Sequence, residues 1–274
     1  MKDFKDKIVY VTGGSQGIGL AAAKQFASRG AHVLIFARRQ AVLEEALKQV
    51  AGKRISDGQR FSCLPLDVSK REDVEAVMFR AVHDFGVPDV LVNCAGYAHP
   101  RYFEDISYAQ FDEIMHVDMY GTWNTTSILA PLMKEKGGYI VNTSSMCGFV
   151  GVFGYADYCA AKFGIVGLSE VLRSELRWHS IAVSVLCPPD TDTPGFAEEN
   201  RTKPPETVAV SGAGSLMKPE EVAKALLAGM ARREFMIIPN LNGKFTWWMK
   251  RLLPGLVDAI MDADIKKVQA KKGT

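Results

Sequence analysis

A tyrosine and a lysine stand four residues apart in the stretch Tyr158-Cys159-Ala160-Ala161-Lys162. In a helix this spacing places the phenol and the ammonium on one face. The reference pKa of tyrosine is about 10, so acid–base work at neutral pH requires stabilisation of its anion. A nearby lysine supplies that stabilisation electrostatically, so the pair predicts proton transfer at the phenol oxygen. Because the spacing alone is common by chance, an ordinary helix surface is an equally good interpretation of these two residues.

A second chemical feature is the glycine-rich segment 12–19, Thr-Gly-Gly-Ser-Gln-Gly-Ile-Gly, which follows an apolar run and precedes a segment of helical period. Glycines at a strand–helix turn let backbone N–H groups approach a pyrophosphate at the positive end of the helix. An ordinary tight turn is the alternative. The residues expected to bind a dinucleotide here are Gly13, Ser15, Gln16, Gly17, Ile18 and Gly19.

The end of the next apolar run distinguishes between two dinucleotides. About 20 residues after such a turn, NAD-binding proteins place a carboxylate on the ribose 2′-hydroxyl. This sequence has Arg38 and Arg39 there and no carboxylate. A guanidinium suits a 2′-phosphate, which a carboxylate would repel. We therefore predict NADPH rather than NADH, with a solvated pair of arginines as the alternative.

Short apolar runs and longer segments of helical period alternate along the chain and must position these residues. Runs that are apolar throughout and separated by helices indicate a parallel sheet covered on both faces. We expect an α/β, Rossmann-like, doubly wound fold with a mostly parallel seven-stranded sheet and helices on both faces. The predicted strands are 8–11, 32–36, 61–66, 90–92, 139–141, 182–186 and 235–238.

Composition excludes several classes of protein. The chain has 274 residues, of which 47% are apolar and 23% are charged, and its formal charge is +2. These values exclude disorder, collagen and a disulfide scaffold, and they give no basic excess for nucleic acid. No uninterrupted apolar run approaches the roughly 18 residues of a membrane-spanning helix.

The five cysteines form no C-x-x-C pair and have no histidine at zinc spacing, so we expect no metal site. Each lies in an apolar stretch, which predicts buried, reduced thiols and a cytoplasmic location.

Taken together, the motifs are similar to those of the short-chain dehydrogenase/reductase family over residues 8–195. The T-G-x-x-x-G-x-G turn, the segment Asn-Cys-Ala-Gly at 93–96, the serines at 144–145 and the Y-x-x-x-K pair occur in the family's order and spacing. The resemblance implies reduction of a ketone by hydride from the nicotinamide. It assigns Ser145 to the carbonyl oxygen, Tyr158 to protonation of the nascent alkoxide, and Lys162 to lowering the tyrosine pKa and to the nicotinamide ribose.

The resemblance also supplies further residues and one departure. It places Asp67 near the adenine and Asn93 in the segment that lines the cofactor. Tyr155 is a second tyrosine near the pair, but it lacks a lysine four residues on. The family usually has Asn where this sequence has Asp118, a residue that acts largely through its backbone carbonyl. An ionised Asp118 near Lys162 would partly neutralise the charge that activates Tyr158, so we expect a modest loss of activity that higher pH compensates.

The segment 187–204 matches the family's substrate lid, predicted over about 189–217. Pro189 replaces the usual glycine, and the run resembles one subfamily, the 3-ketodihydrosphingosine reductases, which implies a long-chain amino ketone as substrate. Thr191 and Thr193 are candidate donors to the cofactor carboxamide. Glu198 and Glu199 are candidates to meet a substrate ammonium, with solvated lid charges as the alternative.

The last segment, 241–274, differs from the rest of the chain. It combines Trp247 and Trp248 with apolar residues at helical spacing, and its net charge of +4 leaves −2 on residues 1–240. This pattern suits a helix lying on an anionic bilayer surface. A helix docked on the body, or a dimer contact, is the alternative. We therefore divide the chain into an NADP-binding domain over 1–240 and a basic, amphipathic appendage over 241–274.

The leading functional hypothesis is NADPH-dependent reduction of a long-chain ketone in sphingolipid synthesis. The alternatives are reduction of another lipid, steroid or acyl-thioester ketone, and a non-catalytic NADP-binding regulatory protein. The expected partners are the lipid substrate, a membrane surface contacted peripherally on its cytoplasmic face, and, by family resemblance, further copies of the chain.

Overall fold

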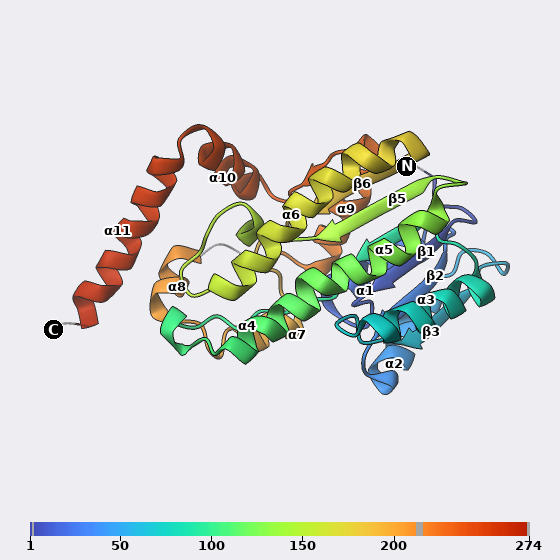
Figure 1. Ribbon diagram of the computed structural model, residues 1–274, viewed down its shortest axis with the longest axis horizontal. Helices are drawn as coiled ribbons and strands as arrows, with labels where there is room; N and C mark the ends of the chain where they lie inside the picture. The colour runs from blue at the N-terminus through green and yellow to red at the C-terminus, as the bar shows by residue number, and fades with distance from the viewer. Residues whose placement is uncertain (2, 212–215, 273–274) are drawn as a thin grey trace.

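The structure is a computed structural model that describes residues 1, 3–211 and 216–272 (Figure 1). Its centre is a seven-stranded sheet in the order β3-β2-β1-β4-β5-β6-β7, and every strand pair in it is parallel. The predicted doubly wound α/β fold is confirmed. The strands are β1 (Ile8–Thr12), β2 (His32–Ala37), β3 (Phe61–Pro65), β4 (Val90–Asn93), β5 (Gly138–Thr143), β6 (Ile181–Leu186) and β7 (Met236–Ile237).

Both faces of the sheet are buried, because alternate side chains of each strand enter two separate apolar cores. In β1, Val9 and Val11 pack on one side and Tyr10 packs on the other. One face is covered by α1 (Gly17–Ala27), α2 (Gln40–Ala51) and α9 (Pro219–Arg232). The other face is covered by α3 (Arg71–Phe85), α5 (Gly121–Met133) and α6 (Ala156–Leu176).

The helix before β5 contains a feature that the sequence patterns did not predict. It runs from α4 (Tyr108–Ile114) through a π-helical segment, η2 (Met115–Tyr120), into α5. A π-helical turn inside a longer helix often marks a functional site. Here it carries Asp118, which is fully buried.

The ends of β1 and β4 form the topological switch point, where strand order reverses and ligands bind in sheets of this type. Thr12 ties the two strand ends together, since its Oγ1 accepts hydrogen bonds from the backbone N–H groups of Cys94 at 3.2 Å and Ala95 at 3.4 Å. The glycine-rich turn and the segment after β4 are therefore adjacent.

Helices after β6 and β7 extend the molecule beyond the sheet (Figure 1). The lid region contains α7 (Pro194–Glu199) and α8 (Pro205–Ser211), while part of the predicted lid, 212–215, lies outside the described residues. The C-terminal helices are α10 (Leu241–Leu252) and α11 (Pro254–Lys272), and α11 lies against both α10 and α8. Among the described helices, none is long and apolar enough to cross a bilayer.

Candidate active site

A cleft of about 800 Å³ extends from the switch point to the C-terminal helices. Its polar end is formed by the glycine-rich turn, the end of β2 and the segment after β4. Its apolar end is formed by α10 and α11, through Phe245, Met249, Val257, Ile260 and Met261. The carboxyl end of β5 and the start of α6 lie between these two ends and carry the predicted catalytic residues.

Close backbone packing shapes the glycine-rich turn. Gly13 has a φ of +65°, and a Cβ on it would lie 2.7 Å from the backbone of Cys94 and Ala95. A Cβ on Gly19 would lie 2.3 Å from the carbonyl oxygen of Gly13. Larger residues would therefore push the turn away from its neighbours. All six predicted dinucleotide contacts of this turn line the cleft: Gly13, Ser15, Gln16, Gly17, Ile18 and Gly19.

The start of α1 is open to a ligand. The residue before it, Gln16, makes no side-chain capping bond to the helix, and its Oε1 instead accepts from Arg39 at 3.4 Å. Arg38 and Arg39 are exposed at the end of β2 and line the cleft. Asp67 lines it at the end of β3, and its carboxylate accepts from the Ser69 hydroxyl at 2.7 Å.

Asn93 lies elsewhere than the sequence predicted, because the structure does not bring it into the cleft wall. Its side chain is buried and donates to Thr126 Oγ1 at 2.9 Å and to Asn142 Oδ1 at 2.8 Å, and accepts from Thr125 at 2.6 Å. These bonds join β4, β5 and α5, so Asn93 supports the strand ends that carry the cleft. The cleft is lined instead by the backbone and side chains of 94–98.

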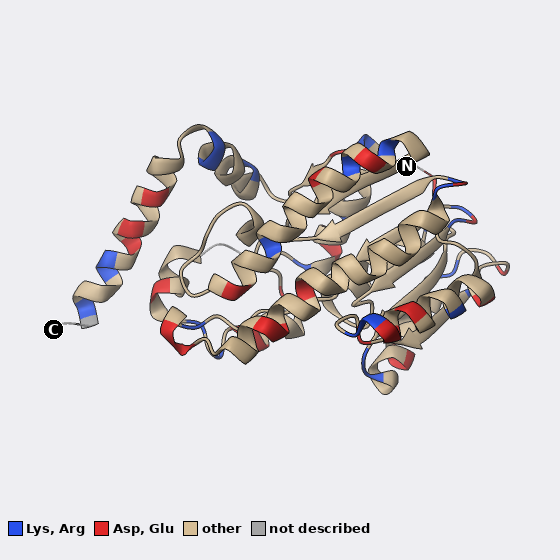
Figure 2. Cartoon of the chain, viewed as in Figure 1, with Lys and Arg blue, Asp and Glu red and all other residues tan. Residues whose placement is uncertain are grey.

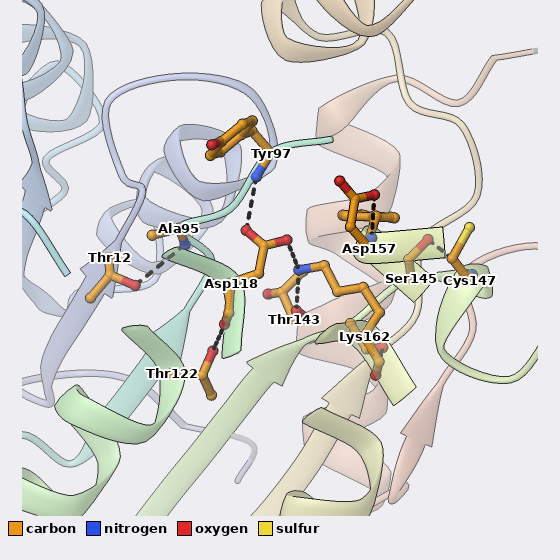
Figure 3. Close-up of polar contacts among 12 residues, drawn as sticks. Thr12, Ala95, Tyr97, Asp118, Thr122, Thr143, Ser145, Cys147, Asp157 and Lys162 are labelled. Carbon is orange, nitrogen blue, oxygen red and sulfur yellow. Dashed lines mark hydrogen bonds and ion pairs between the residues drawn. The ribbon is translucent and has the colours of Figure 1, made fainter. Parts of the chain in front are cut away.

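The structure brings Ser145, Tyr158 and Lys162 into one part of the cleft wall, and Figure 3 shows Ser145 and Lys162 there. Ser145 follows β5, accepts from the Cys147 N–H at 3.1 Å and lies close enough to Tyr158 to lower the pKa of that phenol. Lys162 Nζ lies 5.2 Å from the centre of the Tyr158 ring and donates to the Thr143 carbonyl at 3.2 Å. The neighbouring Ser144 is buried and donates to the Lys162 carbonyl at 2.9 Å, which fastens α6 to β5.

Asp118 contacts the lysine directly, as Figure 3 shows. Its Oδ2 lies 3.2 Å from Lys162 Nζ, and its Oδ1 accepts from the Tyr97 N–H at 3.0 Å. The backbone carbonyl of Asp118 accepts from the Thr122 hydroxyl at 2.9 Å. A Cβ on Gly96 would lie 2.7 Å from Oδ1, so glycine there makes room for the carboxylate. The side chain of Asp118, not only its carbonyl, therefore belongs to this centre.

These surroundings determine which form of Tyr158 is favoured. Burial raises the pKa of Tyr158 well above its usual value, and the Asp118 carboxylate raises it further. The nearby Ser145 hydroxyl lowers this pKa. Burial also raises the pKa of Asp118, an effect that the Lys162 ammonium opposes. The phenol is therefore held in its protonated form, from which it can donate a proton.

The lid places its two threonines at the cleft with different hydrogen bonds. The Thr191 hydroxyl donates to the Pro189 carbonyl at 2.8 Å, so its proton is engaged within the lid. Thr193 Oγ1 accepts from the Phe196 N–H at 3.0 Å and caps α7, which leaves its proton available to a ligand. Of the two predicted donors, Thr193 is the better placed.

The lid also separates its two glutamates. Glu198 is exposed and pairs with Arg201 at 2.9 Å. Glu199 is 16% exposed, lines the cleft and accepts a short hydrogen bond from the Tyr155 hydroxyl. Because Glu198 and Glu199 are adjacent and identical, the sequence alone does not indicate which of them lines the cleft. The packing of α7 determines it.

Sequence reasoning missed several residues of the cleft wall. Tyr97 binds Asp118 through its backbone, which no side-chain motif reveals. Cys147 and Cys159 are buried in one cluster with Tyr155 and against Tyr158. The apolar spacing of α10 and α11 predicted helices but not that they would close one end of the cleft.

Comparisons with known proteins agree with this geometry. The family model described as "short chain dehydrogenase" matches residues 7–204. The chain is 38% identical to "3-ketodihydrosphingosine reductase" of Bos taurus and 40% identical to "3-dehydrosphinganine reductase" of Danio rerio, in each case over 83% of this chain and 69% of the relative. Among solved structures, the "Short-chain dehydrogenase from Sphingobium yanoikuyae in complex with NADPH" has a TM-score of 0.77 and 27% identity, covering 93% of this chain and 95% of that one.

The family model and the two reductases each match most of the chain, and the seven-stranded parallel sheet agrees with the fold of the solved structure. This chain belongs to the short-chain dehydrogenase/reductase family.

Proposed function

We propose that this chain reduces 3-ketodihydrosphingosine to dihydrosphingosine with NADPH. The observation that carries the proposal is the match to curated reductases of that name over 83% of the chain. The cleft supports it physically, because one end is polar and the other is apolar. A substrate with a polar head and a long hydrocarbon tail suits such a cleft.

The polar end fits NADPH. The glycine turn leaves a cradle that a Cβ would fill, and the open start of α1 offers backbone N–H groups to the pyrophosphate. We expect Arg38 and Arg39 to meet the 2′-phosphate, Asp67 the adenine and Lys162 the nicotinamide ribose, since all four line the cleft. A structure of a family member in complex with NADPH resembles this chain over most of its length. Thr193 is the lid residue we expect at the carboxamide.

The reaction needs a hydride, which bound NADPH supplies, and a proton, which the chain supplies. In the proposed mechanism Ser145 donates a hydrogen bond to the ketone oxygen and so orients the carbonyl. As negative charge develops on that oxygen, the proton leaves Tyr158 Oη and forms the alcohol O–H bond. The Lys162 ammonium then stabilises the phenolate. Asp118 holds the lysine in position, and its carboxylate partly offsets the positive charge near Tyr158.

The apolar end of the cleft is where we place the hydrocarbon tail. This part of the cleft is lined by Phe245 and Met249 on α10 and by Val257 and Met261 on α11. Each buried methylene contributes roughly 0.8 kcal/mol, so a long chain would gain much of its affinity here. The appendage 241–274 would thus complete the substrate site of the domain 1–240.

The proposed activity is tested by NADPH consumption with a panel of ketones. The panel contains 3-ketosphinganines of several chain lengths, a steroid ketone and an acetoacetyl thioester. We expect the highest kcat/KM for the long-chain amino ketones. Preference for the steroid or the thioester would instead support a reductase of another ketone. NADPH binding without turnover of any ketone would favour a regulatory protein.

We also propose that α10 contacts the membrane in which such a lipid resides. Leu241, Phe245, Trp248 and Leu252 recur at helical spacing and are exposed by 81%, 67%, 55% and 68%. Lysine and arginine lie on the same helix, while α11 carries both signs of charge (Figure 2). An exposed apolar face flanked by cations suits a peripheral contact with an anionic surface.

Co-sedimentation with vesicles containing anionic lipid tests this contact. The double variant Trp248→Ser/Leu252→Ser should bind vesicles several-fold less than the unaltered chain. Trp178→Ser is the matched control, because Trp178 is 80% exposed but lies in the domain 1–240. Equal vesicle binding by the double variant and the control would remove α10 from the membrane proposal.

Two further proposals concern location and assembly. The five cysteines are free, as a reducing compartment requires, so we propose a cytoplasmic location with contact on the cytoplasmic face of a membrane.

Three aromatic residues are exposed on η2, α5 and α6, namely Tyr120, Trp123 and Phe163. They support a homo-oligomer formed through the surface of these helices. Light scattering of the unaltered chain and of Trp123→Ser would test the assembly.

A further inference from the structure

A carboxylate of the lid lies in the cleft beside the catalytic tyrosine, and its position suggests a role in choosing the substrate. Glu199 is the last residue of α7 and lines the cleft together with Tyr155 and Tyr158. The Tyr155 ring lies 5.8 Å from the Tyr158 ring, and the Tyr155 hydroxyl donates to Glu199. The Glu199 charge is also close enough to raise the pKa of Tyr158.

One oxygen of this carboxylate is available. Tyr155 and Lys203 both contact Oε1, the lysine at 3.3 Å. Among the described residues, no hydrogen-bond partner reaches Oε2. Glu199 therefore has an acceptor to offer a ligand in the cleft, and its partners on Oε1 hold the side chain in place.

The charges around Glu199 leave a net negative charge of one. Lys203 pairs with Glu199 and lies 3.9 Å from Asp190. Both carboxylates line the cleft, whereas the lysine side chain is buried behind them against the ring of Phe196, 4.4 Å from its centre. Two carboxylates and one ammonium would be balanced by one further cation, supplied from the cleft.

We propose that Glu199, held by Tyr155 and Lys203, accepts a hydrogen bond from the ammonium on the carbon next to the substrate's ketone and so selects amino ketones. This inference rests on the proposed function. A carbonyl oxygen bound to Tyr158 and Ser145 would place the neighbouring carbon and its ammonium within a few ångströms of that tyrosine, in the part of the cleft that Tyr155 and Glu199 also line. Tyr155, whose hydroxyl donates to Glu199, thus acts as a positioning residue.

The test compares two long-chain substrates, 3-ketosphinganine and the same molecule with hydrogen in place of the amino group. The measured quantity is the ratio of their kcat/KM values with NADPH. A charge-assisted hydrogen bond corresponds to roughly a 10- to 100-fold preference for the amino ketone. Glu199→Gln should bring the ratio close to one, mainly through a higher KM for the amino ketone. Glu199→Asp, which keeps the charge, should retain much of the preference.

Glu198→Gln is the matched control, since Glu198 is the exposed neighbour in the same helix and should leave the ratio unchanged. Three results would overturn the inference while leaving the proposed function intact. They are an unchanged kcat/KM ratio in Glu199→Gln, an equal fall of that ratio in Glu198→Gln, and a ratio near one in the unaltered chain.

If the unaltered chain reduces neither ketone, the proposed function fails, and binding decides the inference. Dihydrosphingosine is then titrated into NADP-saturated protein. An unchanged Kd in Glu199→Gln would refute the role of Glu199, and a Kd weakened about 10-fold or more would support it.

Discussion

The two ends of the cleft are built in opposite ways. At the nucleotide end, Gly13 and Gly19 lie in backbone contact with their neighbours, and a Cβ on either would fall within 2.7 Å of another main-chain atom. At the tail end, α10 and α11 have large apolar side chains that remain about half exposed or more, and a Cβ on Gly255 would meet nothing within 4 Å. The nucleotide end is therefore held by close backbone contacts, whereas the tail end is loosely packed.

The two ends of the cleft therefore restrict the sequence to different degrees. The dinucleotide end depends on backbone geometry and therefore tolerates few residue types. The tail end depends on apolar area, which many side chains supply. The catalytic residues lie between the two ends, after β5 and on α6.

The largest effect on turnover is expected at the catalytic tyrosine, which lies between the two ends of the cleft. Tyr158→Phe removes the proton donor but keeps the ring, so turnover should fall by roughly 10²–10⁴-fold, the typical contribution of general acid catalysis. NADPH binding, measured by fluorescence titration, should stay within a few-fold of the unaltered chain. Retained turnover would contradict the assignment of Tyr158.

A pair of glycine substitutions tests the contrast directly. Gly19→Ala forces a contact with the Gly13 carbonyl and should cost about 1–3 kcal/mol through overpacking, seen as a lower Tm and an NADPH Kd weakened about 10- to 100-fold. Gly255→Ala, at the start of α11, should change neither quantity. If the two variants behaved alike, the two ends of the cleft would not differ in rigidity.

Substitution of Arg38 tests which dinucleotide the nucleotide end prefers. Arg38→Asp places a carboxylate where we expect the 2′-phosphate, so the preference for NADPH over NADH in kcat/KM should fall by about 10- to 100-fold. Arg29→Asp, on an exposed surface away from the cleft, is the control. An unchanged ratio in Arg38→Asp would overturn the NADPH assignment of this residue.

The tail end should respond to lost apolar area in proportion to chain length. Met261→Ala removes a side chain that lines the cleft, so KM for a long-chain ketone should rise by about 3- to 10-fold. KM for a ketone too short to reach α11 should not move. Ala263→Ser, on the exposed side of α11, serves as control. An equal rise for both chain lengths would place the tail elsewhere.

The smallest effect is expected from Asp118→Asn. The Asp118 carboxylate raises the pKa of Tyr158, so its neutralisation should lower that pKa. Reduction needs the protonated phenol, so the alkaline limb of the pH–rate profile for reduction should move to lower pH. The reverse oxidation needs the phenolate, so the acidic limb of its pH–rate profile should also move to lower pH.

In this variant kcat should change by less than about tenfold, which corresponds to 1.4 kcal/mol. Asp112→Asn, on the surface of the same helix, is the control. A large fall in kcat, or limbs that move to higher pH, would reverse the sign assigned to Asp118.

Much of the fold and of the nucleotide end could be predicted from sequence. The strand, glycine turn and helix over 8–27 form one continuous segment, so local patterns describe them. Ser145, Tyr158 and Lys162 lie close along two neighbouring elements and were also predicted to meet. Asn93 was misplaced because a motif gives a residue's position in the chain but not the direction of its side chain, which here is determined by Thr125, Thr126 and Asn142.

Local patterns in the sequence predicted the individual strands, the glycine cradle, the arginines after β2 and the order of the catalytic residues, because each of these features lies within a short stretch of chain. Tertiary structure alone decided that Asp118 would pair with Lys162, that Glu199 rather than Glu198 would face the cleft, and that α11 would close its apolar end. These outcomes depend on contacts between segments far apart in the chain, where packing decides which of several equivalent side chains is buried.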